Sequence, residues 1–598
     1  MAKNDDRRGK PDEPAKQLKS FQDLLRARGG SPTPEAPAPK PVEIMYDGDL
    51  AARAETLGDE ALELTARERI ARRPNAFAPM EHGPAPYHDE GSEEMQLLAS
   101  FRVRTVFPGD VLRFVAALPR DPDPAEYEGR LDLRSMCIYT IDGEDAKDYD
   151  DAISIEDRDD GTSEIGVHIA DVSHYVRPGT PLDDEALARG TSVYLADQVV
   201  PMLPEGLSNH LCSLVGERDR FAFSVFMVFD AKGTRLSYRI GKSVIRSVRR
   251  NTYREVQELL DGVDSPAVRE MKARGLEQSL KSFQRWTVKQ QGIRDAKGSL
   301  RMASIEKKFV FDERHEVMKI VDAPRYFSMT LIEETALAAN QAVGDFFRER
   351  GLPTIYRVHP EKDAEEIEKV AKGLEEHGIR VPKKDRLTGR DIARLITLAR
   401  KKANAEALIQ RIMGLIERAV YEVHDDKDVA THFGLVRQAY LHFTSPIRRY
   451  PDLMVHRWLH EVLSGGEEAA SKQLKTEDYL ADLNDIASHC SMQADISEMV
   501  ETAVDDLKIC QYLEPHIGKK LSASVLRVSP PGIEVKLLDF NTTGFLPSRT
   551  IGERVEIKGA TIQIKAAKRI FSFTEGHPIA VKIKDVDFLK LQVLLELA

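Results

Sequence analysis

The sequence predicts a multidomain α+β protein, and three observations support this fold class. The chain has 598 residues, which at about 100–200 residues per domain corresponds to several domains. Between about residues 133 and 512, strand-like segments come first and long helical segments follow, without the regular alternation of a doubly wound sheet. From about residue 513 apolar residues alternate with a period of two, which predicts a separate small antiparallel β-barrel.

The composition is that of a globular protein with an acidic balance. Hydrophobic residues make up 41% of the chain and charged residues 31%, which excludes a mainly disordered, collagenous or membrane chain. The 86 Lys and Arg residues are outnumbered by 98 Asp and Glu residues, so the net charge is −12. The basic footprint by which nucleic-acid binders are first recognised is therefore missing from the chain as a whole.

Cysteine usage and hydropathy indicate a cytoplasmic protein. Cys137, Cys212, Cys490 and Cys510 stand far apart and form no CxxC pair, which argues against a disulfide scaffold or a structural zinc site. No apolar run approaches the roughly 20 residues of a membrane span, and the first residues are too polar for a secretory signal peptide. We therefore expect a protein of the reducing cytoplasm with no membrane partner.

The N-terminal part divides into a tail and a small domain. Residues 1–42 are expected to be a disordered tail because repeated prolines interrupt any long element. Within this tail, Lys16–Arg28 could form a short basic helix. In residues 43–132, the alternation in Phe101–Phe107 and Gly109–Leu118 predicts two strands, and with them a small β-barrel domain.

Hydrophobic periodicity also places elements in the remaining chain. In the central region the expected strands are Ile165–Ile169, Phe223–Phe229 and Ile240–Ile245, and the expected helices are Ser328–Arg350, Ala405–Val423 and Tyr479–Tyr512. In the C-terminal region the expected strands are Leu521–Val528, Ile533–Leu538, Thr543–Leu546, Gln563–Ala566, Ile579–Val586 and Leu591–Leu597.

An acidic cluster precedes the first of these strands. Thr140–Ile153 reads TIDGEDAKDYDDAI, with aspartates at 142, 145, 148, 150 and 151. Carboxylates packed so closely repel one another unless solvent or cations neutralise them, and Mg²⁺ prefers such oxygen ligands. In a strand Asp148 and Asp150 would share a face and Asp151 would point away, so convergence requires a turn or loop. A solvated acidic turn is the alternative interpretation of this segment.

Two basic segments lie downstream of the acidic cluster. His442–Arg457 reads HFTSPIRRYPDLMVHR, and its prolines forbid a continuous helix through Arg448 and Arg449. Arginines held on such a turn suit a fixed grip on phosphate, although an isolated RR pair is usually a solvated surface feature. Ile245–Arg254 (IRSVRRNTYR) mixes Arg246, Arg249 and Arg250 with Tyr253, which is typical of a groove for single-stranded nucleic acid.

Taken together, these segments resemble the RNB family of exoribonucleases, the ribonuclease II and ribonuclease R group. The motifs occur in the order DLRSMCIYTIDGEDAKDYDDAISIE, GVHIADVSHYV, GTSVYLADQVVPMLPEGLSNHLCSL, IRSVRRNTYREV, LIEETALAAN and HFTSPIRRYPDLMVHR, between about Asp132 and Cys510. The resemblance implies a central RNB catalytic domain at 133–512 and an S1-type OB RNA-binding domain at 513–598. Residues 43–132 stand where the family carries OB domains of the cold-shock type, or a helix-turn-helix replacement, for nucleic-acid binding.

The resemblance also implies the residues of the site. Arg448 would grip the scissile phosphate and Tyr194 would pack against the 3′-terminal nucleotides. Glu333 would contact the terminal nucleotide, with Glu334 as the adjacent alternative. Met302 stands where relatives carry a second stacking aromatic. Four aspartates would be the catalytic carboxylates that hold Mg²⁺, for which Mn²⁺ can substitute, and organise the attacking water: Asp142, Asp148, Asp150 and Asp151.

The implied reaction is processive 3′→5′ hydrolysis of single-stranded RNA that releases nucleoside 5′-monophosphates. The alternative is a non-catalytic RNA-binding regulator on the same fold, which would be free to lose the four aspartates and Arg448. A monomer is expected. Because no Lys-rich stretch ends the sequence, ribonuclease II-like handling of structured RNA is favoured over ribonuclease R-like handling. The net charge then indicates a basic channel in an acidic shell, with Arg246, Arg249, Arg250 and Arg448 along the path of the RNA.

Overall fold

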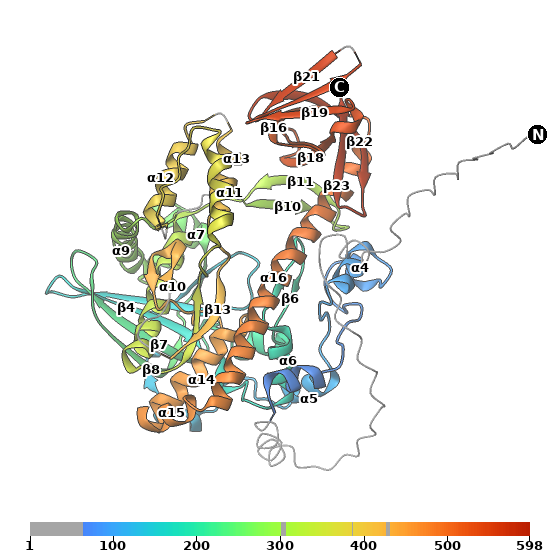
Figure 1. Cartoon of the computed structure of the whole chain (residues 1–598). Helices are drawn as coiled ribbons and strands as arrows, with labels where there is room; N and C mark the ends of the chain where they lie inside the picture. The colour runs from blue at the N-terminus through green and yellow to red at the C-terminus, as the bar shows by residue number, and fades with distance from the viewer. Residues whose placement is uncertain (1–63, 301–305, 385–386, 403, 426–430, 568) are drawn as a thin grey trace, which may run out of the picture.

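A five-stranded mixed sheet organises the first half of the computed structural model, which describes residues 64–300, 306–384, 387–402, 404–425, 431–567 and 569–598 (Figure 1). The expected tail at 1–42 and Met302 lie outside these residues. The strand order is β1–β8–β7–β4–β3, with β1 parallel to β8 and the other neighbours antiparallel. The strands are β1 (Leu131–Asp132), β3 (Asp151–Asp157), β4 (Ser163–Ala170), β7 (Asp219–Phe229) and β8 (Arg235–Arg246).

Most of the long helices follow this sheet in the chain, as the sequence predicts. Local sequence explains their ends: the Thr252 side chain accepts a hydrogen bond from the Glu255 amide at the start of α7, and Gly298, at φ 83°, ends α9. The helices are α6 (Pro181–Arg189), α7 (Tyr253–Leu260), α8 (Pro266–Ala273), α9 (Leu276–Lys297), α10 (Phe327–Arg350), α11 (Ala364–Glu375), α12 (Gly389–Ala399), α13 (Ala405–Met413), α14 (Tyr450–Gly465), α15 (Glu467–Leu474) and α16 (Glu477–Leu513).

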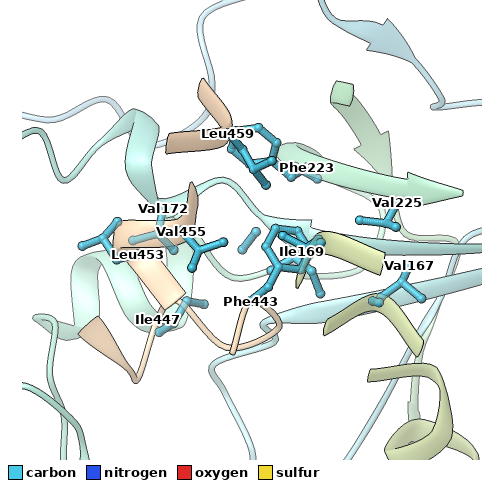
Figure 2. Packing of buried hydrophobic residues seen from close by; sticks show 14 of the residues in the cluster. Val167, Ile169, Val172, Phe223, Val225, Phe443, Ile447, Leu453, Val455 and Leu459 are labelled. Atoms are coloured by element: carbon cyan, nitrogen blue, oxygen red, sulfur yellow. The ribbon is translucent and has the colours of Figure 1, made fainter. Parts of the chain in front are cut away.

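The core between the sheet and α14 holds the loop that precedes this helix. Figure 2 shows apolar side chains of β4, β7, α14 and this loop packed together, including Ile169, Phe223, Val225, Phe443, Ile447, Leu453, Val455 and Leu459. Within this core Phe443 stacks on His456, with ring centroids 4.5 Å apart. Burial of Phe443 and Ile447 therefore fixes the backbone of the segment HFTSPIRRY against the sheet.

One expected helix is wrong in its second half. The sequence predicts a helix over Ala405–Val423, but α13 ends at Met413 and Val420–His424 form β13. Two β-branched valines and Tyr421 suit a strand, and β13 pairs antiparallel with β12 (Thr354–Val358). This partner comes from an earlier part of the chain, so local spacing could not reveal it.

Further short strands pair outside the main sheet. The pairs are β2 (Thr140–Asp142) with β9 (Arg250–Thr252), β5 (Val193–Tyr194) with β6 (Val199–Val200), β10 (Lys307–Phe311) with β11 (Val317–Asp322), and β14 (Thr431–His432) with β15 (Arg437–Gln438). The β2–β9 pair is parallel and the β5–β6 pair is antiparallel. These small pairs anchor loops that the main sheet does not reach.

The C-terminal region is a closed barrel in the strand order β16–β17–β18–β23–β22, at the far end of α16 (Figure 1). The expected barrel is confirmed, but β18 and β23 run parallel, so the expectation of a wholly antiparallel barrel is wrong. Alternation identifies strands and not their partners. The barrel strands are β16 (Lys520–Ser529), β17 (Gly532–Leu537), β18 (Thr542–Pro547), β22 (Pro578–Asp587) and β23 (Gln592–Leu597), and a three-stranded sheet is formed by β19 (Arg554–Lys558), β20 (Thr561–Ala566) and β21 (Arg569–Thr574).

The expected N-terminal β-barrel is wrong for the part of residues 43–132 that the structure describes. Its main elements are the helices α3 (Ala66–Arg72), α4 (Glu93–Ser100) and α5 (Gly109–Ala116). Phe101–Phe107 is a turn and a loop, and the segment after it is α5. The apolar residues Val111, Phe114, Val115 and Leu118 also follow helical spacing, and burial against the catalytic part selects this pattern over alternation. Among the described helices, none combines the length and apolarity needed to cross a membrane.

A buried ion-pair cluster joins this helical region to α6 and α14. Arg69 of α3 donates to Asp183 of α6 at 2.5 Å, and Asp183 also accepts from the Tyr450 hydroxyl (2.8 Å) and from Arg457 (2.5 Å). The Asp183 side chain is completely buried. A buried carboxylate is tolerated only when such partners surround it, so α3 belongs to the folding unit of the catalytic part.

We predict that Arg69→Met destabilises the protein by about 3 kcal/mol, because it leaves part of the buried Asp183 charge without a partner. Arg67→Met is the matched control: Arg67 lies on the same helix and pairs with Asp485, but its side chain is 80% exposed. The control is expected to change stability by less than about 1 kcal/mol. Chemical denaturation measures the free energy of unfolding of both variants. Equal losses of stability would contradict the role of Arg69 as a partner of the buried Asp183 carboxylate.

Candidate active site

The aspartate cluster lies where two anchored strands meet. Asp142 is the last residue of β2, and Asp151 is the first residue of β3. The first strand pairs with β9, with Asp142 opposite Thr252, and β3 pairs with β4, with Asp151 opposite Ile169. The intervening residues form the loop that the sequence requires for convergence of the carboxylates.

Backbone hydrogen bonds hold this loop in place. The Tyr149 amide donates to the Ser213 hydroxyl, and the Tyr149 carbonyl accepts from the Leu214 amide, each at 2.9 Å. The Asp150 carbonyl accepts from the Ala170 amide of β4 at 2.9 Å. The positions of the aspartates therefore depend on contacts to the sheet and to residues 213–214. Asp145, in contrast, is exposed.

Asp150 connects the loop to the segment HFTSPIRRY. The Ile447 amide donates to Asp150 Oδ1 at 2.9 Å, across 297 residues of sequence. Arg448 Nε lies 3.7 Å from Asp150 Oδ2, and the Arg448 side chain remains 39% exposed. The two motifs singled out in the sequence thus meet at one point, with a buried carboxylate beneath a partly exposed guanidinium.

Burial raises the pKa of all four carboxyl groups, and neighbouring carboxylates raise the pKa of Asp142 and Asp150 further. Burial is the main cause in each case. For Asp142, burial and the neighbouring Asp151 raise the pKa to about 8. The pKa of Asp151 rises to about 6, and that of Asp150 rises well above its usual range, both against the opposing charge of Arg448. The site is therefore short of positive charge.

Two carboxylate oxygens indicate where a cation would be accommodated. Asp142 Oδ2 and Asp150 Oδ2 are buried and have no hydrogen-bond partner. Across the described ranges, no three His, Cys, Asp or Glu side chains form a ready-made metal cluster. Mg²⁺ usually binds through one or two carboxylates, keeping waters and substrate phosphates as its other ligands. The oxygen donors of the aspartate loop fit a cation bound in this way.

Tyr194 lies at the edge of the same site. Its hydroxyl is 3.5 Å from Asp148 Oδ2, and the residue is 40% exposed. The strand that carries it is held to the arginine segment, since the Arg448 carbonyl accepts from the Ser192 amide (3.0 Å) and the Thr191 hydroxyl (3.1 Å). Three distant segments thus place an aromatic ring, a carboxylate and a guanidinium together.

The three arginines of Ile245–Arg254 are engaged in contacts within the protein. Arg246 pairs with Asp219 at 2.7 Å, and Arg249 binds Glu255. Arg250 donates to the carbonyl oxygens of residues 143 and 144 at 2.6 and 2.7 Å. Arg250 therefore supports the aspartate loop directly, whereas Arg246 and Arg249 have carboxylate partners of their own.

The structure distinguishes the two adjacent glutamates. Arg294 donates to Glu333 at 2.9 Å and to Glu334 at 2.6 Å. The Glu334 side chain is 1% exposed, whereas that of Glu333 is 44% exposed. Glu333 is thus the member of the pair that solvent and ligands can reach.

Sequence reasoning did not assign Tyr253 to the site. Burial, followed by the charges of Asp151 and Asp142, raises the pKa of its phenol, so this group lies near the aspartates. Tyr253 is the first residue of α7, directly after β9, which pairs with β2. The stretch of arginines and aromatics pointed to Tyr253, but only the β2–β9 pairing reveals its neighbours.

Comparison with known proteins agrees with this geometry. A family model described as the RNB domain matches residues 130–465. Ribonuclease R of Thermotoga maritima is 37% identical over 450 residues, which cover 75% of this chain and 62% of that protein. The chain thus spans less than two thirds of the length of this curated relative.

Solved structures match over most of the chain. Mycoplasma genitalium RNase R in complex with ribose methylated single-stranded RNA has a TM-score of 0.75 at 26% identity, covering 84% of this chain and 77% of that one. Yeast Ssd1, a pseudonuclease, shares the fold with a TM-score of 0.57 at 18% identity, covering 80% of this chain and 58% of that one.

The raised pKa of Asp142 predicts a pH-dependent stability of the metal-free protein. The pKa of an unfolded aspartate is near 4, and burial and Asp151 raise the pKa of folded Asp142 to about 8. Folding therefore takes up a proton between these two values, and the free energy of unfolding falls as pH rises through this range. In EDTA, Asp142→Asn is expected to gain stability relative to wild type as pH rises, by up to about 1.4 kcal/mol per pH unit. Thermal or chemical denaturation from pH 5 to 8.5 measures this difference.

The exposed Asp145 supplies the control, because Asp145→Asn is expected to differ from wild type by a constant amount over this range. Added Mg²⁺ should stabilise wild type more than Asp142→Asn. If the free energies of unfolding of wild type and Asp142→Asn changed in parallel at all pH values, the raised pKa of the Asp142 carboxyl group would be contradicted.

Proposed function

Because the chain belongs to the RNB-domain family, in its ribonuclease R group, we propose that it is a metal-dependent 3′→5′ exoribonuclease. It degrades single-stranded RNA processively by hydrolysis and releases nucleoside 5′-monophosphates. The observation that carries this proposal is the meeting of the aspartate loop and Arg448 at Asp150. The RNA in the complex of the Mycoplasma genitalium relative supports single-stranded RNA as the ligand class.

The aspartates and Arg448 have different roles: the aspartates would bind a cation, and Arg448 would bind phosphate. Asp142, Asp148, Asp150 and Asp151 would hold Mg²⁺ or Mn²⁺, which would supply activation of water and neutralisation of charge on the leaving oxygen. The partly exposed Arg448 guanidinium presents its planar donors to the scissile phosphate. The hydrogen bond from the Ile447 amide fixes the orientation of the Asp150 carboxylate.

Two accessible residues, Tyr194 and Glu333, would position the substrate. Tyr194 is exposed on one side and can stack on a terminal base, a contact worth about 1–3 kcal/mol that tolerates any sequence. The accessible Glu333 carboxylate can accept hydrogen bonds from the hydroxyls of the terminal ribose. Such contacts favour RNA and do not select particular bases, as degradation of varied RNAs requires.

The alternative function is that of an RNA-binding regulator without catalysis. Yeast Ssd1, a pseudonuclease, has the same fold, so the fold alone does not decide between the two. A regulator has no need of buried, mutually repelling carboxylates, which cost free energy. Because this chain retains all four aspartates and Arg448, catalysis is the better explanation.

We predict that Asp150→Asn abolishes shortening of a linear 5′-labelled RNA in Mg²⁺, because the variant loses a buried carboxylate of the site. Asp145→Asn, from the same loop but exposed, is the matched control and should keep wild-type activity. EDTA should stop both active proteins. Gel analysis of the RNA products measures shortening by each protein. Identical products from wild type and Asp150→Asn would refute the proposed catalytic activity.

A duplex with a 3′ overhang, compared with the linear RNA, tests the handling of structured substrates. Ribonuclease R-like activity would degrade the duplex completely, whereas ribonuclease II-like activity would stop near the paired region.

We also predict that Arg448→Lys lowers kcat by about 10²–10³, since an ammonium group cannot reproduce planar, two-point contact with phosphate. Arg269→Lys, which replaces an exposed arginine paired with Asp264, is the control and should leave kcat unchanged. Steady-state kinetics on a homopolymeric RNA provide the measurement. Full activity of Arg448→Lys would exclude a bidentate role for this residue.

A further inference from the structure

The β5–β6 hairpin, which carries Tyr194, packs between the N-terminal helical region and α16. One apolar cluster contains residues of all three parts. The hairpin contributes Val193, Leu195 and Val200, the helical region contributes Tyr87, Met95, Leu97 and Leu98, and α16 contributes Val500, Val504 and Leu507. The support of Tyr194 therefore includes residues outside the catalytic part of the chain.

A buried polar contact at the hairpin turn joins the same three parts. The Tyr87 hydroxyl donates to Asp197 Oδ1 at 2.8 Å. Lys508 Nζ of α16 lies 3.5 Å from Asp197 Oδ2 and donates to Glu94 of α4 at 2.7 Å. The side chains of Asp197, Glu94 and Lys508 are between 1% and 4% exposed.

The contact at Asp197 restricts movement of the β5–β6 hairpin. One buried ammonium group faces two buried carboxylates, so the cluster depends on every donor around it. The Gln511 amide donates to Glu94 at 2.9 Å. Burial and the charge of Asp197 raise the pKa of Tyr87, which therefore remains a donor at physiological pH. Movement of Asp197 would leave a buried charge unpaired.

A second contact fixes the strand next to Tyr194. The Tyr194 amide donates to Glu501 Oε1 of α16 at 3.2 Å, and the Ser497 hydroxyl donates to the same oxygen at 2.8 Å. Glu501 and Lys508 are seven residues apart, two turns of the helix, and so lie on one face of α16. The hairpin is thus held at both the strand and the turn, and the turn contact is the one shared with the N-terminal helices.

We propose that Asp197 is a positioning residue, which, through Tyr87 and Lys508, fixes the β5–β6 hairpin and holds Tyr194 beside Asp148. On this view the N-terminal helical region acts on the active site through the hairpin, by setting how far the 3′ end of the RNA can advance. The inference rests on the proposed exoribonuclease function for its consequence, and on the contacts alone for the anchoring.

Tyr87→Phe and Asp197→Asn test this role with little change of shape. Both are expected to lengthen the shortest RNA product and to raise KM for short oligonucleotides about tenfold, while kcat on long RNA stays within about twofold of wild type. A change confined to KM and product length is not expected from general loss of folding. Tyr238→Phe is the control for loss of a phenol–carboxylate hydrogen bond elsewhere, because the Tyr238 hydroxyl donates to Glu349 at an exposed site between β8 and α10.

Hydrogen–deuterium exchange of the peptide covering residues 193–200 gives a readout independent of activity. Exchange should increase in Tyr87→Phe and Asp197→Asn and not in Tyr238→Phe. Unchanged exchange, or unchanged product length and KM in an active enzyme, would overturn the proposal. If wild type does not shorten RNA while exchange responds as expected, the anchoring stands and the proposed function fails.

Discussion

The hydrogen bond from the Ile447 amide to the Asp150 carboxylate is the contact on which the site depends. It joins a loop near the start of the catalytic part to a segment almost 300 residues later, and it places Arg448 above the buried carboxylate. The loop is anchored by β2 and β3, and Ile447 is held by the core beneath α14. The core beneath α14 thus maintains the arrangement of Asp150 and Arg448.

The aspartate loop concentrates negative charge, and the arginines singled out in the sequence have partners within the protein. The net charge of −12 lacks the basic excess that is typical of nucleic-acid binders. The structure shows why that measure is coarse. Arg246 and Arg249 pair with carboxylates, Arg250 supports the loop backbone, and Arg448 faces the aspartates. Local placement of charge, and not its sum, governs what the surface binds.

Elements with strong and unambiguous periodicity could be predicted from the sequence. The helices at 327–350 and 477–513 and most strands of the C-terminal barrel agree with the expected segments. The sequence-based prediction of an element is wrong where strand-like and helical spacing overlap, or where the pairing strand lies far away in the sequence. Gly109–Leu118 satisfies both alternation and helical spacing, and Val420–His424 becomes a strand only because β12 lies beside it. In both cases tertiary contacts selected the structure.

The sequence by itself determined the family, the set of candidate site residues and the need for a loop among the aspartates, because these follow from residue type and order. Only the tertiary structure decided which groups meet. It separated the accessible Glu333 from the buried Glu334, placed Tyr253 beside the aspartates, and brought the N-terminal helices to the hairpin of Tyr194. The physical reason is that burial and long-range pairing depend on the whole packed chain, whereas periodicity and motifs are local.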